Sequence, residues 1–324
     1  MTRILISAVV GCALSGLLGY LLLPVLRAWK VGQSIREIGP TWHNSKAGTP
    51  MMGGLMFILG AVLCLLFNIW TLQDFTPLYA LALGLCFGAV GFVDDYFKLK
   101  HKRNLGLTAI QKALLQMAVS AVYLYILYMQ GTLTCDIYIP FANTTFYIHP
   151  IAYIFFAMFV MVGCVNAVNL TDGVDGLCAG VTVPVMVFFT AVAIAMGKFD
   201  LALLPGCLVG GLVAYLFYNW HPAKVFMGDT GSLFLGGIVC GLAFALDMPL
   251  ILVLVGLIYI VETLSVILQV GYFKLTGGKR LFKMSPIHHH FEMCGWKEVK
   301  IVFVFSGITA LMCLLAWFGI SGRI

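Results

Sequence analysis

The sequence predicts an all-α, polytopic membrane protein with about ten transmembrane helices and a small extracytoplasmic β-hairpin. Hydrophobic residues make up 61% of the 324-residue chain and charged residues only 10%, which is too apolar for a soluble domain. Apolar stretches of about 18 or more residues recur, and this length spans a hydrocarbon core about 30 Å thick. The alternating polarity of a membrane β-barrel is absent from the sequence.

The predicted helices follow from apolar stretches that are separated by short polar loops. They cover residues 4–26, 51–70, 76–93, 108–130, 150–168, 177–196, 200–218, 231–246, 249–271 and 301–320. The first stretch continues well past Cys12, too far for the apolar region of a signal peptide, so we expect an uncleaved helix. The eighth is short and rich in glycine, so its ends are the hardest to place. No soluble module interrupts the series, and we treat residues 1–324 as a single integral-membrane domain.

Basic residues set the predicted orientation. An even number of helices places both termini on one side of the membrane and five loops on the other. These loops are roughly residues 27–50, 94–107, 169–176, 219–230 and 272–300. Together with Lys112 they hold 16 of the 19 Lys and Arg residues, all except Arg3, Lys198 and Arg323, so the positive-inside rule places them in the cytoplasm. On the opposite side, "TCDIYIPFANTTFYIHP" alternates in polarity around "FAN", which predicts the hairpin.

Two adjacent carboxylates, Asp94 and Asp95, end the third predicted helix in "GFVDDYFK". One of them could pair with Lys98, but neighbouring like charges at a membrane boundary repel each other. A divalent cation or a cluster of cations would relieve that repulsion.

Two further cytoplasmic loops carry acids. In "NLTDGVDG", Asn169, Asp172 and Asp175 are spaced three apart and would share one face if this segment were helical. The loop "NWHPAKVFMGDTGS" ends in Asp229. Taken alone, each of these loops is equally well explained by a turn or a helix start that its acids cap.

Taken together, five carboxylates on one side of the membrane indicate a Mg²⁺ site rather than a zinc site. Mg²⁺ takes oxygen ligands and usually bridges to a substrate phosphate. Four lysines could neutralise the remaining phosphate charge, although each alone is better explained by the positive-inside rule: Lys46, Lys98, Lys102 and Lys112. The last large loop holds the triplet His288–His290. Consecutive residues of a helix cannot all face one ion, so we do not expect a three-histidine metal site.

Six motifs occur in order across residues 46–292: "KAGTPMMGG", "GFVDDYFK", "NAVNLTDGVDGL", "FMGDTGSL", "ETLSVILQVGYFK" and "PIHHHFE". In these motifs the chain resembles the phospho-N-acetylmuramoyl-pentapeptide transferase family of the polyprenyl-phosphate N-acetylhexosamine-1-phosphate transferase superfamily. The acidic motifs are shared across the superfamily, whereas the histidine triplet points to the muramoyl-pentapeptide branch. Met51 and Val174 depart from the family pattern without changing a charged group.

The resemblance implies a Mg²⁺-dependent membrane transferase of peptidoglycan synthesis. Phospho-N-acetylmuramoyl-pentapeptide would pass from its UDP donor to undecaprenyl phosphate, giving lipid I and UMP. The reaction would take place at the cytoplasmic face of the bacterial plasma membrane. The implied partners are UDP-N-acetylmuramoyl-pentapeptide, undecaprenyl phosphate and the lipid bilayer, without nucleic acid. The oligomeric state stays open, with a homodimer among the alternatives.

The resemblance also implies roles for individual residues. Asp229 would be a Mg²⁺ ligand, Asp94 either a base that deprotonates the lipid phosphate or a nucleophile in a two-step route, and Asp95 a support for Asp94 or the metal. His289 is the member of the triplet that we expect to matter most for catalysis. The implied substrate-binding residues are Lys46, Lys98, Lys112, Asn169, Asp172, Asp175, Gln269, His288 and His290.

Two other functions compete with this hypothesis. Within the superfamily, the donor could be UDP-N-acetylglucosamine. In another class, an ion-coupled transporter would carry acids near the middle of its spans and an inverted repeat. Glu262 is the one acid well inside a predicted helix, and no repeat is apparent, which disfavours the transporter.

Overall fold

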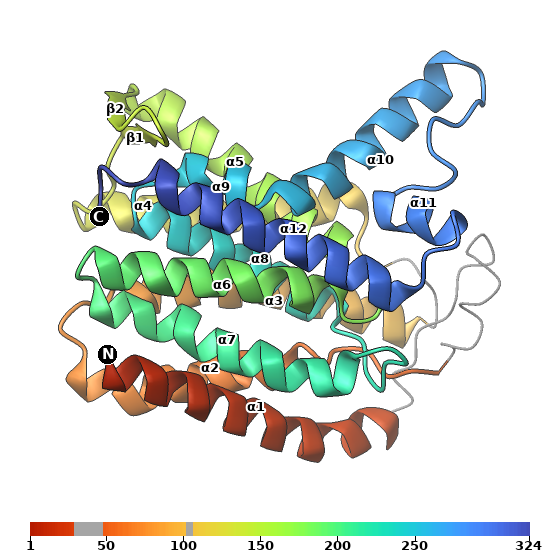
Figure 1. The fold of residues 1–324 in the computed structure, drawn as a ribbon, viewed down its shortest axis with the longest axis horizontal. Coiled ribbons are helices and arrows are strands. Elements are labelled where there is room, and N and C mark those ends of the chain that lie inside the picture. The colour runs from red at the N-terminus through yellow and green to blue at the C-terminus, as the bar shows by residue number, and fades with distance from the viewer. Residues whose placement is uncertain (29–47, 102–105) are drawn as a thin grey trace.

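The computed structural model describes residues 1–28, 48–101 and 106–324. Its helices form a bundle in which both termini lie at the same end (Figure 1). The elements are α1 (Thr2–Ala28), α2 (Leu55–Asn68), η2 (Ile69–Thr71), α3 (Thr76–Lys100), α4 (Ala109–Met129), β1 (Asp136–Ile139), β2 (Thr144–Tyr147), α5 (Pro150–Thr171), α6 (Leu177–Ala195), α7 (Phe199–Asn219), α8 (Gly228–Ala245), η3 (Pro249–Ile251), α9 (Leu252–Val255), α10 (Leu257–Leu275), α11 (Ile287–Met293) and α12 (Glu298–Gly319). Within the described residues, nine helices are long and apolar enough to cross a membrane, so the predicted all-α polytopic fold is confirmed.

Two predicted helices differ from the structure. The second, 51–70, begins at Leu55, and together with η2 it forms a shorter apolar helix than the other nine. Its expected first turn is not helical, because the backbone of residues 50–54 forms hydrogen bonds with the segment before α8. The Gly53 amide donates to the Phe226 carbonyl at 2.8 Å, and the Phe226 amide donates to the Pro50 carbonyl at 2.8 Å. The ninth, 249–271, is divided into η3, α9 and α10.

The predicted hairpin is present at the end of the bundle where the termini lie (Figure 1). Strands β1 and β2 are antiparallel, with Asp136 opposite Tyr147. The Phe141 amide at the turn donates to the carbonyl of Gly319 at 2.7 Å, which ties the hairpin to the end of α12. A two-stranded ribbon is marginal by itself, so this contact with the helical bundle stabilises it.

The glycine-rich helix α8 is the centre of the bundle, with 89% of its most apolar window buried. Its backbone packs closely on α3: a Cβ added at Gly237 would lie 2.9 Å from the Cα of Gly84. Small residues at such contacts let two helix backbones approach each other, which is a common basis of helix packing in membranes. The contact places the last turns of α3 beside the first turn of α8, at the end of the bundle opposite the termini.

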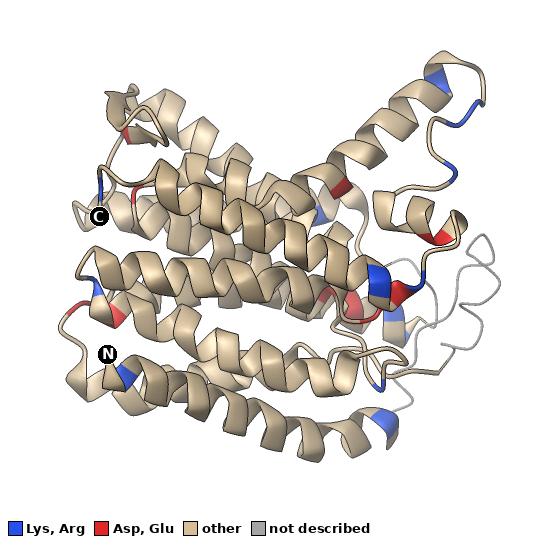
Figure 2. Cartoon of the chain, viewed as in Figure 1, with Lys and Arg blue, Asp and Glu red and all other residues tan. Residues whose placement is uncertain are grey.

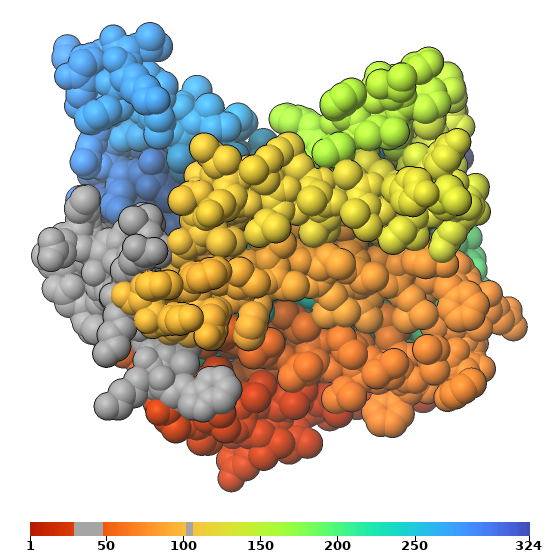
Figure 3. Space-filling view, turned by 180° about the vertical axis from the view of Figure 1, so that it is seen from behind, coloured from red at the N-terminus to blue at the C-terminus, as the bar shows by residue number. Residues whose placement is uncertain are grey.

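Charged residues concentrate at the ends of the helices (Figure 2). The end that carries the loops after α3, α5 and α7 has the larger share of them in this view. Helix α10 leans away from the bundle, and the chain then turns back so that α11 lies below α10 in this view (Figure 1). Seen from behind, a notch separates α10 from α5 (Figure 3).

Candidate active site

Asp95 at the end of α3 caps the start of α8. Its Oδ1 accepts a hydrogen bond from the Asp229 amide at 3.2 Å, and its Oδ2 accepts from the Thr230 amide at 2.9 Å and the Thr230 hydroxyl at 2.7 Å. The first amides of a helix have no partner within the helix, and a carboxylate satisfies them well. Gly228 must be glycine here, since its φ is +75° and a Cβ would lie 2.6 Å from Asp95 Oδ2. Asp95 therefore fixes the position of Asp229.

The Asp229 carboxylate is the point where four helices meet. Its Oδ2 lies 3.0 Å from Lys98 Nζ of α3 and 2.7 Å from Lys112 Nζ of α4. Its Oδ1 accepts a hydrogen bond from Asn169 Nδ2 of α5 at 3.0 Å, and Asn169 also donates to Ser232 Oγ at 2.8 Å. Two lysines and an amide thus hold one carboxylate in a fixed orientation.

Asp94 completes a cluster of three carboxylates. Its Oδ2 lies 2.7 Å from Lys98 Nζ, and its Oδ1 accepts from the Leu107 amide at 2.8 Å. Ligand oxygens of Asp94, Asp95 and Asp229 all lie within 4.8 Å of one another, so this cluster could hold a metal ion. An all-oxygen donor set of this kind fits a hard divalent cation. We call Asp94, Asp95, Asp229, Lys98 and Lys112 the α3/α8 cluster.

Asp172 follows the last residue of α5 and lies near the α3/α8 cluster. Burial raises the pKa of its carboxyl to about 8, and the negative charges of Asp229, Asp95 and Asp175 act in the same direction, whereas Lys98 opposes them. A bound cation would favour the ionised form and lower this pKa, because opposite charge stabilises a carboxylate. The pKa of Asp172 therefore depends on the charge of any ion or ligand that binds in the cluster.

Asp175 belongs to a second group of side chains. Asp175 does not share a helical face with Asn169, because α5 ends at Thr171 and the chain then turns. Asp175 Oδ2 instead lies 2.9 Å from His221 Nδ1 and accepts from the Ala223 amide at 3.0 Å, while its own amide donates to Glu298 Oε2 at 2.9 Å. These contacts join the loops after α5 and α7 to the start of α12. No role was predicted for His221 or Glu298, because the contact between the loop after α7 and the start of α12 depends on the tertiary fold.

The three histidines of α11 take three different partners. His288 is fully buried, and its Nδ1 lies 3.0 Å from Glu262 Oε2 of α10. His289 Nδ1 lies 2.5 Å from Glu292 Oε2, and His290 Nδ1 accepts from the Lys283 amide at 3.2 Å. The rings do not converge on one point, as expected for consecutive residues of a helix.

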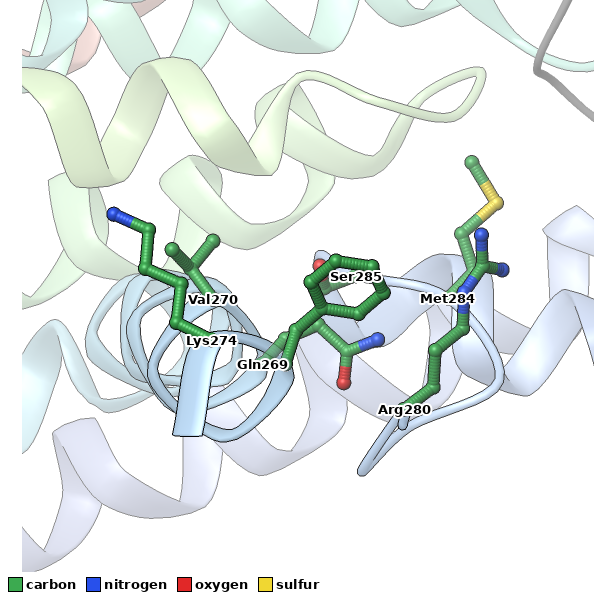
Figure 4. Close-up of a pocket in the computed structure, with 7 residues that line it drawn as sticks. Gln269, Val270, Lys274, Arg280, Met284 and Ser285 are labelled. Carbon is green, nitrogen blue, oxygen red and sulfur yellow. The ribbon is translucent and has the colours of Figure 1, made fainter. Parts of the chain in front are cut away.

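Gln269 of α10 organises the loop that follows this helix. Its Oε1 accepts hydrogen bonds from the amides of Leu281 at 3.0 Å and Phe282 at 2.9 Å. The loop and the helix enclose a pocket of about 300 Å³ (Figure 4). Its lining residues are Gln269, Val270, Phe273, Lys274, Arg280, Met284 and Ser285.

The structure therefore brings together part of the predicted site. Asn169 contacts the α3/α8 cluster directly and Asp172 lies beside it. Four predicted residues form contacts away from this cluster: Asp175 with His221, Gln269 with its own loop, His288 with Glu262, and His290 with Lys283. His289 contacts Glu292, which also belongs to α11. Lys46 and Lys102 lie outside the described residues, so their predicted roles stay predictions.

Comparisons with known proteins agree with this arrangement. Residues 77–247, which run from α3 through α8 and contain the α3/α8 cluster, match the model of glycosyl transferase family 4. The chain is 46% identical to the phospho-N-acetylmuramoyl-pentapeptide-transferase of Clostridium acetobutylicum over 98% of this chain and 99% of that protein. It is 48% identical to the enzyme of that name from Clostridium perfringens strain 13, over 97% and 98%, and 48% identical to that of Carboxydothermus hydrogenoformans, over 99% and 98%. Identity of this extent, over nearly the whole length of each relative, shows that the chain belongs to the phospho-N-acetylmuramoyl-pentapeptide transferase family.

Proposed function

We propose that this transferase moves phospho-N-acetylmuramoyl-pentapeptide from UDP to undecaprenyl phosphate, producing lipid I and UMP, with the whole chain acting as one catalytic domain. The observation that carries the proposal is the α3/α8 cluster, in which carboxylates and lysines from separate helices meet at one end of a membrane bundle. A membrane-bound lipid phosphate and a nucleotide from the aqueous phase can meet at such a place. The relatives carry the name of this activity over their full length.

The reaction needs positioned charge more than covalent chemistry from the protein. An oxygen of the lipid phosphate forms a bond to the phosphorus that carries the sugar, and the bond from that phosphorus to UMP breaks. Lys98 and Lys112 would neutralise phosphate oxygens, since both side chains reach the middle of the cluster. Asp229 would hold Mg²⁺ with support from Asp95, and the bound ion would neutralise charge on the diphosphate.

Asp94 has two candidate roles, which lead to the same products. As a base it would take the last proton of the lipid phosphate, a modest task because the second pKa of a phosphate monoester is about 6. As a nucleophile it would first displace UMP and then yield the sugar phosphate to the lipid. Only the second route exchanges labelled UMP into the donor when undecaprenyl phosphate is absent.

The remaining predicted residues would hold the nucleotide donor. Asn169 and Asp172 flank the α3/α8 cluster on the α5 side, and Asp175 would hold their loop in place through His221. Gln269 and the segment of α11 would line the side that receives the sugar and peptide. Lys46 would neutralise phosphate charge.

The choice of donor tests this function. We expect purified protein to release UMP from UDP-N-acetylmuramoyl-pentapeptide with undecaprenyl phosphate, and to give little or no transfer from UDP-N-acetylglucosamine. His289→Ala should lower activity far more than Lys300→Ala, because the Lys300 ammonium lies over the Trp296 ring at 4.1 Å on the exposed side of α12. A radiolabelled transfer assay with the two donors measures both comparisons. Preference for UDP-N-acetylglucosamine would refute the muramoyl donor while leaving the superfamily chemistry in place.

The proposed orientation, with the α3/α8 cluster in the cytoplasm, has a separate test. Cys294 is exposed after α11, at the end of the bundle that carries the cluster, whereas Cys135 lies beside the hairpin at the other end. In variants that keep one of these two cysteines, we expect an impermeant thiol reagent to modify Cys135 in intact cells and Cys294 only after the membrane is opened. Modification of Cys294 in intact cells would reverse the orientation.

A further inference from the structure

Helix α4 supplies Lys112 to the α3/α8 cluster, yet little of its own surface is packed in the bundle. Its most apolar window is 22% buried, the lowest fraction among the nine long apolar helices of the described residues. The buried residues of α4 are Gln116, Ser120, Tyr123 and Leu124. In residues 109–119, the half of the described helix that lies nearest the cluster, the one buried side chain is therefore the amide of Gln116.

The Gln116 amide pairs with the amide of Asn166 on α5. Gln116 Nε2 donates to Asn166 Oδ1 at 3.3 Å, and Asn166 Nδ2 donates to Gln116 Oε1 at 2.7 Å. Asn166 Nδ2 also donates to the Val162 carbonyl at 2.8 Å, which fixes the orientation of its amide. An amide within a membrane helix is costly to bury unless it is hydrogen-bonded, so the pair favours one register of α4 on α5.

The amide pair lies one helical turn from the contact that Lys112 makes with α5. Lys112 Nζ donates to Asn169 Oδ1 at 3.4 Å. Lys112 and Gln116 are four residues apart on α4 and share one face of that helix. Their partners on α5, Asn169 and Asn166, are three residues apart and share one face as well. Since α4 and α5 are successive membrane helices of opposite direction, the register that pairs the amides also brings Lys112 to Asn169 and Asp229.

The other contacts at this end of α4 define where the helix begins rather than its rotation about its axis. The Leu107 amide donates to Asp94 Oδ1 at 2.8 Å, and the Thr108 side chain caps the helix. Apolar side chains that face lipid resist rotation little, because lipid tails are as apolar as leucine. A lysine has a flexible four-carbon stem, so its ammonium follows the helix rather than holding it. The paired amides, in contrast, lose both hydrogen bonds when α4 rotates.

We propose that Gln116 is a positioning residue, which fixes the rotation of α4 against α5 through Asn166 and thereby keeps the Lys112 ammonium at the Asp229 carboxylate. The inference rests on the proposed transferase function and adds a residue that acts through Lys112 without touching substrate. The amide pair is neutral, so it keeps its geometry when a cation or a phosphate changes the charge of the α3/α8 cluster. Lys112 can then exchange Asp229 for phosphate oxygens while α4 stays in place.

Gln116→Met tests the proposal, because methionine has the length of glutamine but no amide. We expect kcat/KM to fall at least about 10-fold, since a small displacement of a charged group in an active site has effects of this size. The temperature of thermal unfolding should change little, because one hydrogen bond between membrane helices contributes modestly to stability. Ser120→Ala is the matched control. Ser120 is buried one turn further along the same face of α4, but its hydroxyl donates to the Gln116 carbonyl at 2.9 Å within the helix, so its removal should leave activity unchanged.

A double-mutant cycle with Lys112→Ala separates positioning from a general structural role. If Gln116 acts through Lys112, Gln116→Met lowers kcat/KM by less than about 2-fold once the lysine is absent. A general loss of packing would instead multiply the two losses. Multiplied losses in the cycle, or an unaltered kcat/KM in Gln116→Met alone, would overturn the proposal.

Exchange of the two amides provides a rescue that decides the question if Lys112→Ala turns over too slowly to measure. The double variant with Gln116→Asn and Asn166→Gln keeps both amides and their combined length, so it should recover most of the activity that Gln116→Met loses. Absence of any recovery would contradict the proposal. If Gln116→Met does not fold, Gln116→Asn takes its place, because its amide is one carbon too short to reach Asn166. Unaltered protein without transferase activity would refute the proposed function instead.

Discussion

Asp229→Asn is expected to lower turnover by roughly 100- to 1000-fold, the loss typical when one preorganised charged group is removed from an active site. The amide has the shape of the carboxylate but cannot bind a divalent cation as an anion does, and it no longer balances the charges of Lys98 and Lys112. The fold should persist, because Asp95 bonds the backbone amides of residues 229 and 230 rather than the Asp229 side chain. Asp94→Asn and Asp172→Asn should also reduce turnover severely.

Turnover of the purified variants, with solubility and thermal unfolding measured in parallel, provides the comparison. Asp136→Asn is a suitable control because this exposed acid lies in the hairpin at the opposite end of the molecule. Chelation of divalent cations should abolish activity of the unaltered protein, and added Mg²⁺ should restore it. Near-normal turnover of Asp229→Asn, or full activity in the presence of a chelator, would contradict the assignment of a metal ligand.

Gly91→Ala is expected to inactivate the protein although it changes no charge. A Cβ at this position would overlap the Asp229 carbonyl oxygen and lie 2.7 Å from the Thr230 amide nitrogen. Helices α3 and α8 would have to separate, which displaces Asp229 from the lysines that contact it. Overpacking of this kind usually costs about 1–3 kcal/mol of stability, and displacements near 1 Å can reduce turnover about 100-fold.

Gly163→Ala is the matched control for this substitution. Gly163 lies in the middle of α5, and among the described residues no atom outside its own helical turn lies within 4 Å of an added Cβ. Thermal unfolding and turnover of the two variants should therefore differ clearly, with Gly163→Ala close to the unaltered protein. Equal activities would mean that the close approach of α3 and α8 does not control the geometry of Asp229.

Much of the fold could be predicted because a membrane imposes strict requirements on length and polarity. The hydrocarbon thickness sets the helix lengths, and the bias of basic residues sets the expected sides of the loops. The centre of the bundle was less apparent. Helix α8 is short and rich in glycine, and its glycines indicate its location only when the partner helix α3 is known. The break before α10 was missed because the apolar character continues through Gly256.

The candidate site was predictable to the extent that its residues lie in recognisable motifs. Asp94, Asp95 and Asp229 stood out as acids at apolar helix ends, and the structure places them together. The sequence could not assign partners, because pairing depends on tertiary contacts between distant segments. Glu262 was visible as an acid within a span, but its contact with His288 crosses 26 residues and a change of helix.

The cap that Asp95 forms on α8 has a consequence for biosynthesis. The hydrogen bond from the Asp229 amide to Asp95 joins residues 134 positions apart, so the start of α8 receives this cap from a distant part of the chain rather than from its immediate neighbours. A nascent chain that has inserted only α1 to α7 contains the lysines and Asp94 but lacks Asp229, which both lysines contact. The cluster can therefore form only after α8 has been synthesised and has packed on α3.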